Sequence, residues 1–214
     1  MRILITAGGT REYIDPVRFI SNASSGRMGY ALARAALKAG HKVTLITAPS
    51  SLRVPEGVRA VRVETAAELF EAVKKNFDKC DCLIMTAAVA DYTPCRKLKE
   101  KIKKGKGNLI IKLKPTDDIL RWAGKHKNKS RVTRHGRRIV VGFALEDRNL
   151  RKNAERKLKE KNLDMIVANE PGAIGSEKSS VLIKVCNQFW LKYTGMRKTV
   201  TSRKIIKLIE TIHR

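Results

Sequence analysis

Short apolar runs alternate with segments of helical spacing along most of this chain, and this alternation limits the folds it can adopt. The apolar runs carry Val, Ile, Leu and Ala at consecutive positions, which is typical of strands buried on both faces of a parallel sheet. They lie at residues 2–7 (RILITA), 42–47 (KVTLIT), 59–63, 80–90 (CDCLIMTAAVA), 137–145 (RRIVVGFAL) and 164–169 (DMIVAN). Helices are predicted between them, at residues 24–39, 66–76, 117–127 and 149–161.

The alternation predicts an α/β fold: a Rossmann-like, doubly wound, mostly parallel sheet with helices on both faces. A further strand is expected at residues 110–113 (IIKL). Towards the C-terminus, residues 181–185 (VLIKV) and 189–193 (FWLKY) predict a hairpin, and a terminal helix is expected from residue 202. A chain of 214 residues can bury one substantial core, so we expect a single domain over residues 1–214.

The charge is strongly unbalanced, with 46 Lys and Arg against 20 Asp and Glu and a net charge of +26. Residues 96–138 hold 17 basic and 3 acidic residues, a net of +14. We interpret residues 93–108 as a flexible basic flap and residues 124–138 as a second basic connector. Positive charge at this density attracts polyanions, either nucleic acid or phosphorylated substrates. The alternative is a solvated Lys-rich surface that binds no ligand. Trp122 is the only aromatic residue in this stretch, which disfavours recognition of nucleic acid by stacking.

The N-terminus, MRILITAGGT, reads as a first strand rather than a signal peptide. Apolar runs such as residues 139–145 are far too short to span a bilayer. Four cysteines, at positions 80, 82, 95 and 186, lack the paired spacing of a zinc site and are expected to be reduced thiols. We therefore expect a cytoplasmic protein that makes no membrane contact.

The stretch SNASSG (21–26) precedes a predicted helix, with Ser24 or Ser25 as its N-cap and Gly40 as its C-cap. Ser24, Gly26 and Gly29 would form the lip of this helix. The free N–H groups and the dipole of a helix N-terminus suit phosphates, and glycines let a phosphate approach the backbone. The alternative is a helix cap without a ligand.

A dinucleotide site is disfavoured. The glycines after the first strand do not open a helix directly, and the second strand ends in Thr47-Ala48-Pro49, without the acidic residue that would bind a ribose. A nicotinamide oxidoreductase is therefore not expected.

The stretch GGTREYIDPVRFISNASSGRMG, together with AAVADY at 87–92, resembles the phosphopantothenoylcysteine synthetase family. The resemblance covers nearly the whole chain. It continues through residues 100–104, 118–120, 142–144, 161–164 and 168–169. The chain departs from the family pattern at residues 115–118 and 172–180, which leaves the contacts to the nucleotide base open.

This resemblance implies a ligase that joins 4′-phosphopantothenate to L-cysteine in coenzyme A biosynthesis. It implies an acyl-nucleotidyl intermediate, acyl-CMP here, with release of pyrophosphate and with Mg²⁺ accompanying the triphosphate. The stretches 15–18 and 20–22 look like the bacterial and archaeal branch, so CTP is expected rather than ATP. The alternative is a basic nucleic-acid-binding protein on a Rossmann-like scaffold.

The resemblance also implies a homodimer, for which the C-terminal hairpin is a candidate contact, and a phosphopantothenoylcysteine decarboxylase domain or protein as a partner. On the substrate side, it assigns Asn22 to the acyl intermediate and Arg18 to the substrate phosphate across the dimer. Ala88 and Asp91 are assigned to the substrate as well, and Lys101 is the catalytic lysine of the flap. A guanidinium suits phosphate, and an amide can stabilise a developing oxyanion.

On the nucleotide side, the resemblance assigns residues to the phosphates, the sugar and the base. These are Gly8, Ser24, Gly26, Gly29, Ala87, Phe143, Lys157, Lys161 and Asn169. Lys157 and Lys161 are four residues apart on a predicted helix and therefore share one face. No metal ligands are assigned.

Overall fold

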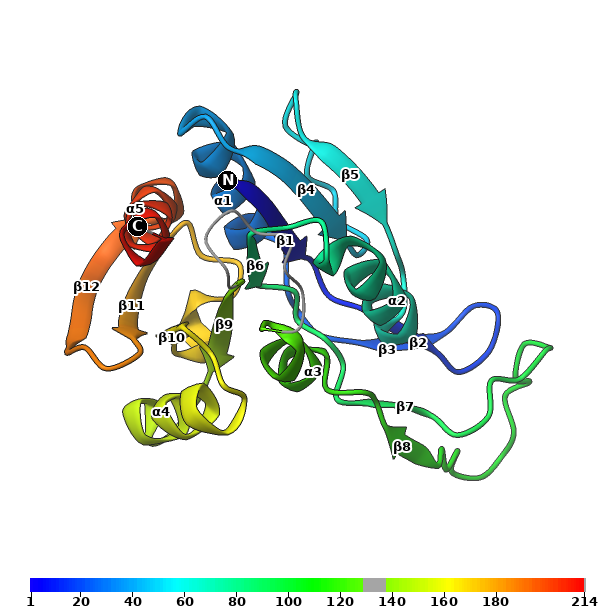
Figure 1. Ribbon diagram of the computed structural model, residues 1–214. Coiled ribbons are helices and arrows are strands. Elements are labelled where there is room, and N and C mark those ends of the chain that lie inside the picture. The colour runs from blue at the N-terminus through cyan, green and yellow to red at the C-terminus, as the bar shows by residue number, and fades with distance from the viewer. Residues whose placement is uncertain (129–137, 214) are drawn as a thin grey trace.

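The computed structural model describes residues 1–128 and 138–213, and within them one eight-stranded sheet forms the centre of the molecule (Figure 1). The strand order is β12-β11-β10-β9-β6-β1-β4-β5. The parallel strands are β1 (Arg2–Ala7), β4 (Lys42–Thr47), β5 (Arg59–Arg62), β6 (Cys82–Met85), β9 (Ile139–Leu145) and β10 (Met165–Asn169). The antiparallel hairpin β11 (Lys178–Val185) and β12 (Trp190–Arg197) extends the sheet at one edge.

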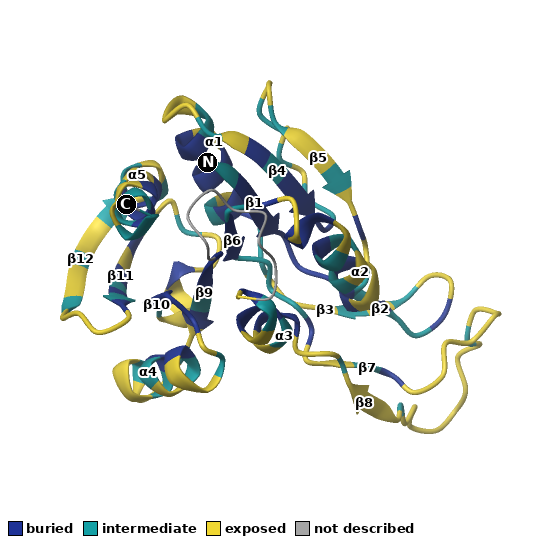
Figure 2. Ribbon diagram, viewed as in Figure 1, coloured by how far each residue is buried: buried dark blue, intermediate teal, exposed yellow. Residues whose placement is uncertain are grey.

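Helices cover both faces of this sheet, because alternate residues of each central strand point to opposite sides. Ile3 and Ile5 pack with α1 (Arg27–Lys38) and α5 (Lys198–His213). On the other face, Leu4 packs with α2 (Ala66–Phe77), α3 (Ile119–His126) and α4 (Leu150–Glu160). In Figure 2 the central strands β1, β6 and β9 are dark, whereas the edge strand β12 is largely yellow, in agreement with a core around the middle of the sheet. The predicted doubly wound fold with its C-terminal hairpin and helix is confirmed.

Two short hairpins lie outside the central sheet. One is β2 (Arg11–Tyr13) with β3 (Phe19–Ser21), and the other is β7 (Tyr92–Pro94) with β8 (Leu113–Pro115). We call residues 92–115 the arm, which projects from the body beside the β2–β3 hairpin (Figure 1). The predicted strand at 110–113 was therefore wrong: only Leu113 is in a strand, and that strand pairs within the arm because it lacks the apolar faces of a core strand.

Contacts with the loop after β2 hold the arm. The amide of Leu98 donates to the carbonyl of Ile14 at 2.9 Å. The buried carboxylate of Asp15 accepts from the amide of Ile102 at 3.1 Å, and Arg18 donates to the carbonyl of Ile102 at 3.0 Å. The segment predicted as a basic flap is thus tied to the stretch that carries Arg18. Of the second basic connector, residues 129–137 lie outside the described part of the chain.

Charged residues are paired where the strands begin. Lys127 and Asp164 form a buried ion pair at 2.9 Å, and Asp164 also accepts from the amide of Val140 at the start of β9. Arg2 pairs with Asp81 at 2.6 Å, just before β6. We call these two pairs the amino-edge ion pairs. Nearby, burial raises the pKa of the Cys80 thiol to about 12, so this thiol is not a nucleophile near neutral pH.

The terminal helix α5 starts at Lys198 rather than at residue 202, directly after β12. A 3₁₀ turn, η1 (Pro171–Ala173), connects β10 to β11. In the described part of the chain, no helix is both long and apolar enough to cross a membrane.

Candidate functional site

A pocket of about 700 Å³ opens where β6, β9 and β10 end. In open parallel sheets, ligands bind at the carboxyl ends of the strands. The chain leaving β6 contributes Ala87 and Ala88, the end of β9 contributes Phe143, and the end of β10 contributes Asn169. These predicted site residues are far apart in the sequence, and parallel pairing brings them to one edge.

The start of α1 forms one wall of the pocket, from Asn22 to Gly29. The predicted serine N-cap was wrong. Gly26 is the N-cap, with a left-handed φ of 75°, and no side chain caps the helix. Ser24 lies two residues before the N-cap, where its hydroxyl accepts from the amide of Gly26 at 3.3 Å. The first N–H groups of α1 therefore have no side-chain partner and are open to an anion.

Two glycines bring this wall close to the strands. A methyl group at Gly29 would lie 2.5 Å from Cβ of Ala7 and 2.7 Å from the hydroxyl oxygen of Thr86, so only glycine fits. At Gly26, an added Cβ would come within 3.3 Å of the amide nitrogen of Gly8. Gly8 does not line the pocket itself but lies directly beneath the lip, as predicted from the sequence.

Asn22 connects this wall to the chain after β6. Its amide nitrogen donates to the carbonyl of Ala88 at 3.0 Å and to the carbonyl of Val89 at 3.1 Å. Asp91, a little further along, also lines the pocket and is exposed. Asn22, Ala88 and Asp91 thus all line the pocket, and their assignment to one substrate stays a prediction.

On the opposite side, α4 provides two lysines. The ammonium of Lys157 donates to the carbonyl of Phe143 at 2.9 Å, and no ion pair with a carboxylate forms there among the described residues. Burial, and then the nearby charge of Lys161, lower the pKa of Lys157. Lys161 is paired with Asp118 at 2.9 Å. Lys157 is therefore a partly buried cation that forms no ion pair among the described residues, which suits a phosphate ligand.

Two further cations line the pocket that the sequence did not indicate. The guanidinium of Arg27 donates to the carbonyl of Gly175 at 2.9 Å. The ammonium of Lys198 donates to the carbonyl of Ala173 at 3.1 Å. Each side chain read as an ordinary surface residue, because only the folded chain brings the start of α5 and the turn after β10 next to the start of α1.

Three carboxylates also line the pocket: Asp91, Asp117 and Asp118. Burial alone would raise the pKa of Asp118, but hydrogen bonds from the amide of Arg121 and from Lys161 hold it below its usual range. Among the described residues, no group of three His, Cys, Asp or Glu side chains could hold a metal ion. Magnesium in nucleotide enzymes usually binds one or two carboxylates plus substrate phosphates, and Asp91 or Asp117 could serve in that way.

Besides Gly8, two predicted site residues do not line the pocket. Arg18 pairs with Asp15 at 2.9 Å and contacts the arm. Lys101 is exposed on the arm, next to Ile102. Within a single chain, the structure does not bring Arg18 and Lys101 together with the lip and the α4 lysines.

The family profile described as the DNA/pantothenate metabolism flavoprotein C-terminal domain matches residues 1–212. The chain belongs to this family. A coenzyme A biosynthesis bifunctional protein CoaBC from Borreliella burgdorferi is 41% identical over 97% of this chain and 52% of its own length. A cysteine/cysteine sulfinic acid decarboxylase from an unknown prokaryotic organism is 45% identical over 97% of this chain and 58% of that protein. The chain thus spans little more than half the length of these relatives.

Solved structures of the flavoprotein C-terminal domain family agree with the fold. The crystal structure of the C-terminal domain of a CoaBC protein is 39% identical, covers 99% of this chain and 94% of that chain, and gives a TM-score of 0.83. A Cab2 mutant in complex with phosphopantothenate-cysteine is 18% identical, with a TM-score of 0.75 over 99% of this chain and 86% of that chain. At that identity, the second likeness concerns the fold alone.

Proposed function

We propose that this chain is the ligase that joins 4′-phosphopantothenate to L-cysteine in coenzyme A biosynthesis, with CTP as the activating nucleotide. The observation that carries the proposal is Lys157, which is partly buried at the pocket. Among the described residues it donates to a carbonyl and pairs with no carboxylate, and the same pocket has a helix start that no side chain caps. Family membership and the CoaBC relatives support the same reaction class.

The chemistry would proceed in two steps. First, a carboxylate oxygen of phosphopantothenate attacks the α-phosphorus of CTP. The bond from that phosphorus to the bridging oxygen breaks, and pyrophosphate leaves. Second, the amine nitrogen of cysteine attacks the acyl carbon, the bond from that carbon to the CMP oxygen breaks, and the nitrogen loses a proton. The product is an amide, with CMP released.

The pocket has groups suited to both steps. The N–H groups at the start of α1 and the ammonium of Lys157 would stabilise negative charge on the triphosphate. Asn22 would position the acyl group, and Asp91 would accept a hydrogen bond from the substrate. Phe143 and Asn169 at the ends of β9 and β10 would contact the nucleoside. Mg²⁺ would arrive with the triphosphate, held mainly by phosphate oxygens.

The same proposal includes a homodimer, and exposed apolar side chains gather on the arm and on the β2–β3 hairpin. They are Val17, Phe19, Tyr92, Leu98, Leu109, Ile110 and Leu113. Ile110 is 86% exposed. Exposed apolar surface of this kind can mark a protein interface. The C-terminal hairpin also carries an exposed apolar side chain, Phe189, which is 94% exposed. We place the dimer contact on the arm, because that placement would bring Arg18 and Lys101 to the partner's pocket.

Because the bifunctional relatives are about twice as long as the matched region, we also propose a decarboxylase domain or protein as the partner that consumes the product. A single ligase domain over residues 1–214, acting in the cytoplasm, completes the proposal. Nucleic acid and membrane are not proposed as partners.

The test is release of pyrophosphate with 4′-phosphopantothenate and Mg²⁺, comparing CTP with ATP, each with and without cysteine. We expect release with CTP that depends on phosphopantothenate, and amide product only when cysteine is present. Release with ATP alone would overturn the nucleotide assignment. Folded protein that releases no pyrophosphate with either nucleotide, yet binds DNA or RNA in a salt-sensitive way, would favour the nucleic-acid alternative.

The dimer is tested with Ile110→Lys, a substitution at an exposed position that should leave the fold intact. Sedimentation should show a dimer for the wild type and a monomer for the variant, with pyrophosphate release lost together with the dimer. Phe189→Lys, which changes an exposed side chain of the C-terminal hairpin outside the pocket, is the matched control and separates the two candidate contacts. A dimer that persists in Ile110→Lys would contradict the placement of the interface on the arm.

A further inference from the structure

We propose that Lys198, with Arg27 beside it, forms a second phosphate-binding side of the pocket, which holds the terminal phosphates of the triphosphate and the pyrophosphate made from them. This inference deepens the proposed function and rests on it. The two residues have no role in the resemblance from which the other site residues were assigned.

The first argument is position. Arg27 opens α1, directly after the lip residue Gly26, and Lys198 opens α5. Both line the pocket. They belong to the helices on one face of the sheet, whereas Lys157 and Lys161 belong to α4 on the other face. The strand ends lie between the two faces, so cations approach the pocket from both sides and a chain of phosphates lying along the lip would contact each.

The second argument is the partners that these cations have. In the described part of the chain, neither Arg27 nor Lys198 forms an ion pair. Each donates to a single backbone carbonyl on the segment 173–175. An ammonium has three N–H donors and a guanidinium has five, so both can keep these bonds and still bind phosphate oxygens.

The third argument is that the arrangement is electrostatically unfavourable without a ligand. Two positive side chains lie close together, each at the start of a helix, where the helix dipole disfavours positive charge. Partial burial, and then the charge of Arg27, lower the pKa of Lys198. A bound polyphosphate removes both penalties at once.

The arrangement also gives a role to residues 172–175, which belong to the stretch where the chain departs from the family pattern. The carbonyls of Ala173 and Gly175 hold Lys198 and Arg27 at the pocket. Ala173, Ile174 and Gly175 line the pocket themselves. In this chain, the segment would therefore act by positioning cations for phosphates.

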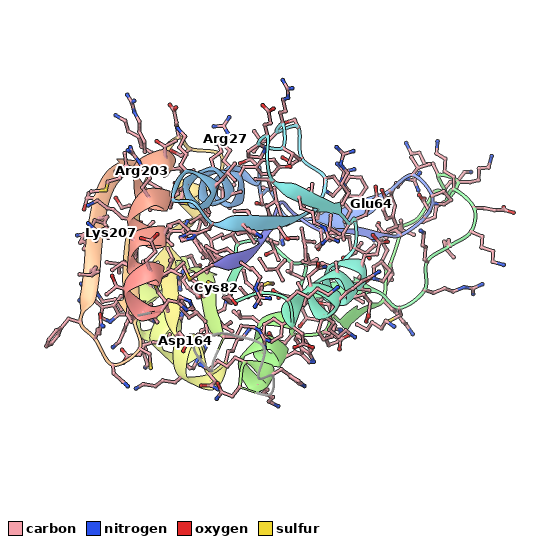
Figure 3. All side chains as sticks on the ribbon, turned by 45° about the horizontal axis from the view of Figure 1, so that its top comes forward. Arg27, Glu64, Cys82, Asp164, Arg203 and Lys207 are labelled. Atoms are coloured by element: carbon pink, nitrogen blue, oxygen red, sulfur yellow. The ribbon has the colours of Figure 1, made fainter. Side chains whose placement is uncertain are left out.

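The experiment measures binding of tripolyphosphate and of CMP by calorimetry, without Mg²⁺, to the wild type, Lys198→Met and Lys207→Met. Lys207 is exposed further along α5 and serves as the matched control; Figure 3 labels it well away from Arg27. We expect the tripolyphosphate Kd to rise about 10- to 100-fold in Lys198→Met, because a charge-assisted hydrogen bond is lost. It should be unchanged in Lys207→Met, and CMP binding should be unchanged in both.

Arg27→Gln changes an exposed side chain and provides a second test if Lys198→Met is poorly folded. Lys198→Arg should retain most of the affinity. In steady state, the KM for CTP should rise more than kcat falls, because the terminal phosphates are bound both before and during the chemical step. Wild-type affinity for tripolyphosphate in both Lys198→Met and Arg27→Gln would overturn this inference while leaving the ligase intact. A wild type that releases no pyrophosphate from any triphosphate would overturn the proposed function itself.

Discussion

Cations have different partners at the two ends of the central parallel strands, which we call the amino edge and the carboxyl edge. At the amino edge, Lys127 and Arg2 each lie against a carboxylate, that of Asp164 or Asp81. At the carboxyl edge, Lys157 and Lys198 lie against backbone carbonyls. Lysines are buried or partly buried at both edges, but Lys157 and Lys198 pair with no carboxylate among the described residues.

This difference distinguishes charged residues that stabilise the fold from charged residues that are suited to bind a ligand. A buried charge is costly unless it is paired, so a protein that leaves one without a carboxylate gains stability by binding an anion. The carboxyl-edge cations should therefore affect binding more than stability, and the amino-edge ion pairs should affect stability more than binding.

The largest effect is expected at the buried amino-edge pair. Asp164→Leu removes the carboxylate partner of Lys127 and leaves the lysine charge in the interior. It should lower the free energy of unfolding by about 3–5 kcal/mol. Chemical denaturation would measure it. Adding Lys127→Met in the double variant should restore much of the loss, because an apolar pair replaces an ionic one. A loss under 1 kcal/mol in the single variant, on the same scale, would contradict the structural role of the pair.

At the carboxyl edge, Lys157→Met should lower pyrophosphate release by about 10²–10³-fold, the usual cost of removing one group that stabilises developing charge. The free energy of unfolding should not fall, since the variant removes a desolvated cation. Lys159→Met, on the exposed side of the same helix, is the matched control and should keep full activity. If Lys157→Met lowered stability but kept full activity, Lys157 would have a structural role, which would contradict its assignment to ligand binding.

A smaller effect is expected for the exposed pair of the amino edge. The side chain of Arg2 is 40% exposed and that of Asp81 is 13% exposed, so solvent screens their interaction. Arg2→Met should lower the free energy of unfolding by about 1 kcal/mol, well below the effect of Asp164→Leu. Equal losses for the two variants would show that the contribution of an amino-edge ion pair to stability does not depend on its burial.

The smallest effect is a change in bound protons. Burial lowers the pKa of Lys157, so this lysine releases its proton at a lower pH in the folded protein than in the unfolded chain. Stability from this group therefore rises with pH between the lowered pKa and the ordinary lysine pKa. Within that interval, binding of tripolyphosphate should raise the pKa and take up a fraction of a proton. Calorimetry in two buffers of different ionisation enthalpy should show less uptake in Lys157→Met.

Most of the fold could be predicted from the sequence, because β1, β4, β6, β9 and β10 are apolar on both faces and read clearly as buried strands. The short strands β2, β3, β7 and β8 could not, since they bury no complete face and pair only with each other. The helix cap was misplaced because serines resemble caps, whereas the backbone turns at Gly26.

For the site, the resemblance indicated Asn22, Phe143, Lys157 and others that the structure places at one pocket. It did not indicate Lys198, the first residue of α5. Its position depends on α5 packing beside α1, a contact between distant parts of the chain that local spacing does not encode. Arg18 and Lys101, which the resemblance also indicated, lie outside this pocket within the single chain.

Gly29 has a consequence for how this site can vary. Since even a methyl group there would overlap Ala7 and Thr86, the depth at which α1 sits against the strands depends on the absence of a side chain. In a library of all single substitutions, position 29 should therefore be as intolerant as Lys157, although for a steric reason. Intolerance to substitution at this pocket would thus report the fit between helix and sheet as well as contact with a ligand.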